Sequence, residues 1–215
     1  MKMDETKINS DLNKMLQSDH VPEEKNNPQD LFNQYKKLFE AKNFFEALEI
    51  LTQSLRKGFP LAEFEMGKHY YSGSDQLGIG IDYLKAFEHF TEAALLGHAG
   101  AHYYQGLMYL KGLGVVLDVN QALLSLNLAA AQGEIEALGA LGKIYQFGYS
   151  DILPDLKKAE SYYKDAVNLG HPASTLNLAA LLETQLRFEE AYELMIESAK
   201  MGYIGAIDYC LNTYK

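Results

Sequence analysis

Six histidines are the side chains of this sequence that come closest to forming a metal site. His98 and His102 lie four residues apart, and on a helix this spacing turns two imidazoles toward one side, where they could bind a metal ion. No carboxylate or thiol at the same spacing completes the ligand set. His98 and His171 also both follow a glycine in a segment that recurs along the chain. We therefore predict no metal site.

Other residue patterns that could support catalysis or cofactor binding are incomplete. The glycine-containing segments 78–80 and 112–114 resemble phosphate-binding loops, but they lack the strand-to-helix context and the Lys-Ser/Thr pair. Glu189 and Glu190 point about 100° apart on a helix, so they cannot converge on one substrate. No Ser-His-Asp or Cys-His set is identifiable, and we interpret Cys210 as a packing residue. We predict a non-enzyme without a cofactor.

The composition narrows the class of partner. The 215 residues carry a net charge of −10, which argues against a broad basic patch for nucleic acid. The single cysteine allows no disulfide within the chain, and the first twenty residues contain no apolar segment that would direct export. No apolar run has the length that crosses a bilayer. We therefore expect a cytoplasmic protein, not inserted in a membrane, with a protein or peptide partner.

The elements that hold these residues recur along the sequence. An alanine is followed eleven residues later by a glycine five times. The pairs are Ala47/Gly58, Ala86/Gly97, Ala122/Gly133, Ala159/Gly170 and Ala191/Gly202. A period of this size is typical of stacked helical repeats. It predicts units 28–60, 61–98, 99–134, 135–171 and 172–203, and a terminal helix 204–215.

The spacing inside the units predicts two helices in each. The pattern AxxxxGxxYxxG begins at Ala62, Ala101 and Ala137, and its last glycine should end the first helix in a left-handed conformation. Asp82, Asp118 and Asp155 stand four residues before the repeat alanine, where they can cap the second helix.

Residues 1–27 form a polar N-terminal segment that is either disordered or contains one short amphipathic helix with Ile8, Leu12, Met15 and Leu16. Asn27 and Pro28 are suited to begin the first helix of the repeats, as cap and first helical residue.

These patterns resemble the Sel-one-like repeat, a subclass of the tetratricopeptide repeat superfamily. Segment 101–118, AHYYQGLMYLKGLGVVLD, followed by NQALLSLNLAAAQG, carries the resemblance best, and GIGIDYLKAFEHFTEAALLGH and DLKKAESYYKDAVNLGH repeat it. The resemblance implies an all-α, right-handed superhelical solenoid of about eleven helices over residues 28–215. It also implies that the first helices line a concave surface.

The variable positions of the first helices are therefore the predicted partner-binding residues. They are Phe32, Lys36, Phe39, Phe64, Lys68, Tyr71, Tyr103, Leu107, Lys143 and Gln146. Aromatic side chains there could hold a peptide or helix, and lysines could reach acidic groups. Several could equally be core residues between repeats.

The resemblance implies a non-catalytic scaffold or adaptor that binds a protein, in bacteria often linked to secretion, virulence or signalling. The alternative is an immunity protein that neutralises a toxin in the same groove. Homo-oligomerisation is left open.

Overall fold

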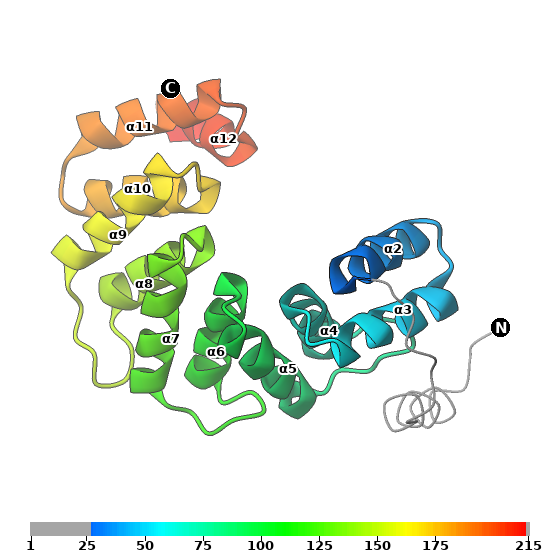
Figure 1. Ribbon diagram of the computed structural model, residues 1–215. Helices are drawn as coiled ribbons and strands as arrows, with labels where there is room; N and C mark the ends of the chain where they lie inside the picture. The colour runs from blue at the N-terminus through cyan, green and yellow to red at the C-terminus, as the bar shows by residue number, and fades with distance from the viewer. Residues whose placement is uncertain (1–26, 214–215) are drawn as a thin grey trace. The chain divides into compact units, whose positions relative to one another are not determined.

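The computed structural model describes residues 27–213, and their side chains as far as residue 208. Regular structure in this range is helical, apart from the isolated bridges Ser74–Ile79 and Tyr149–Ile152. The eleven helices, shown in Figure 1, are α2 (Pro28–Glu40), α3 (Phe44–Arg56), α4 (Pro60–Ser72), α5 (Tyr83–Leu95), α6 (Ala99–Lys111), α7 (Val119–Ala131), α8 (Ile135–Phe147), α9 (Leu156–Asn168), α10 (Pro172–Thr184), α11 (Phe188–Lys200) and α12 (Ile204–Thr213). The all-α prediction is confirmed. The short helix considered for residues 1–27 lies outside the described residues, except for Asn27.

The helices begin at the residues that the sequence indicates. The Asn27 side chain accepts a hydrogen bond from the backbone N–H of Gln29 at 3.1 Å, and Pro28 is the first helical residue of α2. Asp82 accepts from the N–H of Lys85 at 3.1 Å, and Asp155 accepts from the N–H of Lys158 at 3.0 Å. These side chains satisfy amides that have no partner inside the helix.

The glycines that end the first helices do not share one conformation. Gly112 is left-handed, with φ 64° and ψ 37°. Gly73 and Gly148 also have positive φ, but their ψ values of 158° and 166° are extended. The predicted left-handed end is therefore wrong for Gly73 and Gly148. Their extended ψ lets the chain leave the helix directly into a loop that holds an isolated bridge.

Each of the three long loops is closed by the same backbone hydrogen bond. The N–H of the aspartate before the second helix donates to the carbonyl of the tyrosine in the first helix. The distances are 2.9 Å for Asp82 to Tyr70, 3.1 Å for Asp118 to Tyr109 and 2.7 Å for Asp155 to Tyr145. The loops differ in length, and the shared closure holds the two helices in the same register.

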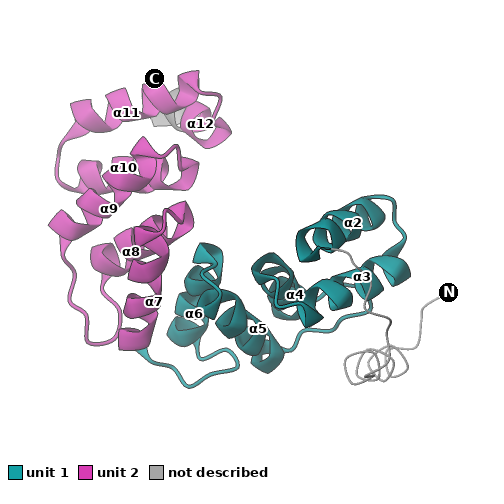
Figure 2. Cartoon of the chain, in the orientation of Figure 1, with its two compact units in different colours: residues 1–118 teal, residues 119–215 magenta. Residues whose placement is uncertain are grey.

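The chain divides into two compact units, residues 1–118 and 119–215, which are coloured separately in Figure 2. Each has its own hydrophobic core. The five repeat alanines of the second helices are fully buried, as are Ala62, Ala101 and Ala137 in the first helices. Small residues at these positions let neighbouring helices approach closely.

In the pairs α4–α5 and α8–α9, a glycine of the first helix lies against an aromatic ring of the second. A Cβ added at Gly67 would lie 2.7 Å from the ring of Phe90, and one added at Gly142 would collide with Tyr163. Phe90 and Tyr163 occupy the same place, four residues after the repeat alanine, and both are fully buried. The glycine therefore provides the space that the ring fills.

Aromatic contacts join the first helices of unit 1 side by side. The Tyr35 hydroxyl on α2 lies 2.9 Å from Nε2 of His69 on α4. At the start of α6, His98 stacks on Phe64 of α4 with ring centroids 4.0 Å apart. The pKa values of His69 and His98 are both lowered, and the largest cause is burial. The nearby charges of Glu65 and Lys68 have smaller effects. Both imidazoles are therefore neutral in the folded protein near pH 7.

We expect Gly67→Ala to destabilise unit 1. An added Cβ would lie 2.7 Å from the fully buried Phe90 ring, so overpacking should cost about 1–3 kcal/mol. The better helix propensity of alanine offsets about 1 kcal/mol of this cost. The control is Gly80→Ala, because a Cβ there meets no atom within 4 Å. Thermal unfolding should show a lower Tm for Gly67→Ala and an unchanged Tm for the control, and equal Tm values would contradict the packing described.

Acidification should weaken the contact between α4 and α6 that His98 makes with Phe64. The folded pKa of His98 lies below its unfolded value, so the unfolded chain takes up the proton first and stability falls as the pH drops below about 6.5. His98→Phe keeps an aromatic ring, as at the equivalent Phe59, and removes the titration. Its Tm should fall less than that of the wild type between about pH 7.5 and about pH 5.8. An identical fall in both proteins would refute this account.

Candidate protein-binding surface

Two lysines above aromatic rings are the repeated polar feature of the first helices in unit 1. Lys36 Nζ lies 5.4 Å from the ring centroid of Phe32 on α2, and Lys68 Nζ lies 5.4 Å from that of Phe64 on α4. The two pairs occupy equivalent positions of successive units. Because α2 and α4 adjoin through Tyr35 and His69, both ammonium groups belong to one helical layer. A cation held over a ring keeps a defined position while it stays accessible.

The predicted aromatic residues are more deeply embedded than their lysines. Phe32 is 6% exposed and belongs to the core of unit 1. Phe39, Phe64 and Tyr71 are half-buried and pack against that core. Phe64 contacts Phe90 and Tyr104 besides His98. A polar residue at any of these rings would therefore disturb the fold as well as any partner contact.

The remaining predicted residues are more accessible or are engaged in other contacts. Tyr103 and Leu107 lie one turn apart on α6, and both are half-buried. In unit 2, Lys143 is exposed on α8. Gln146, on the same helix, accepts a hydrogen bond from the Tyr163 hydroxyl at 2.7 Å. The structure thus brings the unit 1 residues into adjoining helices, and Lys143 and Gln146 belong to α8 of unit 2.

The surface around the two lysines carries both positive and negative side chains. Glu65 forms an ion pair with Lys68 at 2.8 Å. Burial raises the pKa of Tyr35 and of Tyr71, so both phenols stay protonated near pH 7. They can pack and donate hydrogen bonds, but they offer no phenolate nucleophile. The arrangement is suited to binding a complementary surface.

Unit 2 contains a pair of carboxyl groups at the start of α8. Burial, together with a hydrogen bond to Glu136, raises the pKa of Glu134 to about 7. The same hydrogen bond lowers the pKa of Glu136, and the nearby charge of His171 acts in the same direction. No group of three or more metal-ligating side chains occurs in the part of the chain that the structure describes. Of the two carboxyl groups, Glu134 is therefore the one that holds its proton to higher pH.

The sequence reasoning missed an apolar edge in unit 1. Ile81, Leu84, Val116 and Leu117 are 59%, 58%, 84% and 52% exposed. Gly114 touches the backbone of Tyr83 and Leu84, so the loop that contains Val116 lies against the start of α5. The signal was present in the run VVL inside a predicted loop, where polar residues are the norm.

The sequence reasoning also missed the role of Tyr104. Its ring stacks on Phe90 with centroids 4.6 Å apart and contacts Tyr71 at 5.2 Å. It therefore links α6 to both helices of the preceding pair. Its neighbour Tyr103 is a predicted partner-binding residue, and only the packing of the helices distinguishes the two tyrosines. Within the described residues, no helix is long and apolar enough to span a membrane.

Comparisons with known proteins agree with this architecture. The Sel1 repeat matches three consecutive segments, residues 60–98, 99–134 and 135–171, which together make up more than half of the chain. A chitin synthase regulatory factor of Schizosaccharomyces pombe is 31% identical over 137 residues, which is 63% of this chain and 22% of the relative. A chitin synthase regulator of Saccharomyces cerevisiae is 35% identical over 116 residues, 50% of this chain and 17% of the relative. The chain thus matches only about a fifth of the length of these relatives.

Solved structures show the same fold. A protective antigen of uropathogenic Escherichia coli with an SLR fold matches with a TM-score of 0.73 at 22% identity, over 93% of this chain and 41% of the antigen. A Sel1 repeat protein of Oxalobacter formigenes has a TM-score of 0.64 at 23% identity, over 78% and 48% of the two chains. An immunity protein of Pseudomonas aeruginosa has a TM-score of 0.58 at 21% identity, over 87% and 71%. The repeats, their helix pairs and these matches together show that the chain belongs to the Sel1 repeat family.

Proposed function

We propose that this chain is a non-catalytic scaffold in the cytoplasm, and that the first-helix layer of unit 1 binds a protein or peptide partner. The observation that carries the proposal is the repeated lysine above an aromatic ring, at Lys36 and Lys68, on adjoining helices. Tyr103 and Leu107 extend the layer onto α6 with a partly exposed apolar surface. The single cysteine supports a reducing compartment.

The chemistry of this layer favours a segment that carries both acidic and apolar side chains. Carboxylates of the partner would approach Lys36 and Lys68, and an apolar side chain would lie against Tyr103 and Leu107. Phe32 and Phe64 hold the lysines in place from below, so their contribution to binding is indirect. Aromatic residues of a partner would gain most from the partly buried surface on α6.

The relatives suggest how such a scaffold could act. Two of them are chitin synthase regulators of fungi, which supports a regulatory binding role for this chain through another protein. A bacterial adaptor role in secretion or virulence remains a prediction. The same holds for the immunity alternative, because the likeness to the Pseudomonas immunity protein is at 21% identity and concerns the fold.

The binding layer is tested by reversing charge without touching the rings. In Lys36→Glu/Lys68→Glu, two attractive contacts become repulsive, and affinity for the partner should fall about tenfold or more. The partner is first captured from native lysate with the wild-type chain and identified, and its affinity is then measured with purified proteins. Far-UV circular dichroism should stay unchanged, because both lysines lie above the core.

The matched control is Lys37→Glu/Lys157→Glu. It makes the same change in net charge at two exposed lysines, one next to Lys36 on a different side of α2 and one on the second helix α9. We expect its affinity to stay within about twofold of the wild type. Equal loss in both double variants would show that only the overall charge matters and would refute the assigned layer.

A further inference from the structure

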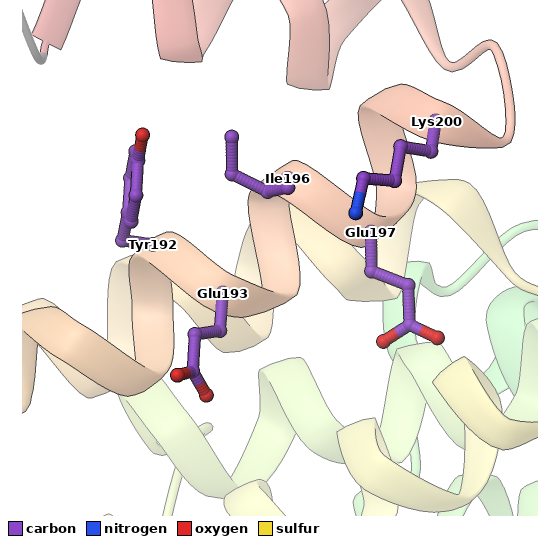
Figure 3. Close-up of a pocket in the computed structure, with 5 residues that line it drawn as sticks. All are labelled: Tyr192, Glu193, Ile196, Glu197 and Lys200. Atoms are coloured by element: carbon purple, nitrogen blue, oxygen red, sulfur yellow. The ribbon is translucent and has the colours of Figure 1, made fainter.

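Two positions of the second helices, two and six places after the repeat alanine, point to solvent. In α5 they are Glu88 and Glu92, and both are exposed. In α11 they are Glu193 and Glu197, which are also exposed and project from one side of the helix in Figure 3. We call these positions the outer row of a second helix. In α3 and α9 the outer row consists of Glu49, Gln53, Ser161 and Asp165, of which Gln53 is half-buried and the others are exposed.

The outer row of α7 is apolar. It consists of Leu124 and Leu128, which are 55% and 41% exposed. Ala131 lies one turn further along the same side and is also exposed. The other second helices fold with polar or charged residues at these positions, so the repeat itself does not require leucine there. Two exposed leucines one turn apart therefore indicate a contact surface.

The remaining sides of α7 are occupied by the fold of unit 2. Ala122, Leu126 and Ala129 are fully buried on the side opposite the outer row. On one flank, the Asn127 side chain accepts a hydrogen bond from the Tyr162 hydroxyl of α9 at 3.2 Å. The outer row lies on the side that is covered neither by this core nor by the neighbouring second helix. Its leucines are consequently available for a contact with another molecule.

The charge of α7 indicates what covers its outer row. None of its thirteen residues is acidic or basic, and every other helix that the structure describes contains at least one charged residue. Because the whole chain has a net charge of −10, two copies repel each other wherever their acidic surfaces meet. At α7 two copies can approach without bringing carboxylates together. An uncharged stripe selects neither an acidic nor a basic partner, and the same stripe on a second copy complements it.

We propose that the outer row of α7 joins two copies of this chain in a symmetric dimer. A two-fold contact uses the same surface of both copies, so Leu124 of one copy meets Leu128 of the other and the reverse holds across the axis. The two α7 helices run antiparallel, and the small Ala131 lets them approach closely. One helix of each copy makes a small interface, so the dimer is reversible with a Kd of about 10 μM. The contact involves residues of unit 2 and does not depend on the proposed function.

Sedimentation equilibrium of the full chain, from about 1 μM to about 200 μM, tests the dimer. The mass of the wild type should rise from that of a monomer to that of a dimer. Leu124→Glu/Leu128→Glu gives α7 the same outer row as α5 and α11, so the helix should persist and far-UV circular dichroism should stay unchanged. Its Kd for dimerisation should rise about a hundredfold, because the apolar contact is lost and carboxylates face each other.

The matched control is Leu95→Glu/Leu169→Glu, which makes the same change in net charge at leucines that are 76% and 54% exposed at the ends of α5 and α9. Its Kd should stay within about twofold of the wild type. A wild type that stays monomeric throughout, or equal Kd values for the two double variants, overturns the proposal. Lys36→Glu/Lys68→Glu should dimerise like the wild type, which separates this result from the test of the lysine layer.

Two further results would assign the outer row of α7 to another occupant and so overturn the proposal. The first is a monomeric wild type that dimerises once residues 1–26 are deleted, because that segment would then cover the row. The second is a series of oligomers that keep growing with concentration, because the contact would then join two different surfaces. A species that stops at the dimer, with the same Kd after the deletion, supports a second copy as the occupant.

Discussion

The close approach of two helices over a glycine is the contact on which the pairs α4–α5 and α8–α9 depend. Phe90 and Tyr163 fill the space that Gly67 and Gly142 leave open, and both rings are fully buried. A larger residue at either glycine would separate the helices of the pair. The separation would then pass to the next helix, because the same ring also touches it: Phe90 stacks on Tyr104 of α6. Packing within a pair and packing between pairs therefore depend on the same side chain.

The loop closure complements this packing. The hydrogen bond from Asp82, Asp118 or Asp155 to the tyrosine carbonyl fixes where the second helix begins, whatever the loop between them contains. The loops are consequently free to vary in sequence, and they carry exposed apolar residues such as Val116. Because the helix pairs stay fixed while the loop sequences vary, a repeat protein can acquire a partner without losing its fold.

The lysines of the first helices show how one layer can serve both packing and binding. Phe64 is covered by His98 on the side of the next unit and carries Lys68 above its ring. The ring packs against the core, whereas the ammonium group stays near the surface. The lysine contacts the folded core only through the ring beneath it. We therefore expect that its charge can be reversed by substitution without loss of structure.

The sequence alone determined the all-α class, the helix caps at Asn27, Asp82 and Asp155, and the buried repeat alanines, because these depend on local geometry and on a period visible in one chain. Only the tertiary structure decided which variable residues are covered. Phe32 and Tyr103 occupy equivalent sequence positions, yet Phe32 is 6% exposed and Tyr103 is half-buried. The same holds for Gly73 and Gly112, which share a motif position but differ in ψ. Burial depends on neighbouring helices and ψ on the loop that follows, and neither is contained in the spacing of the motif.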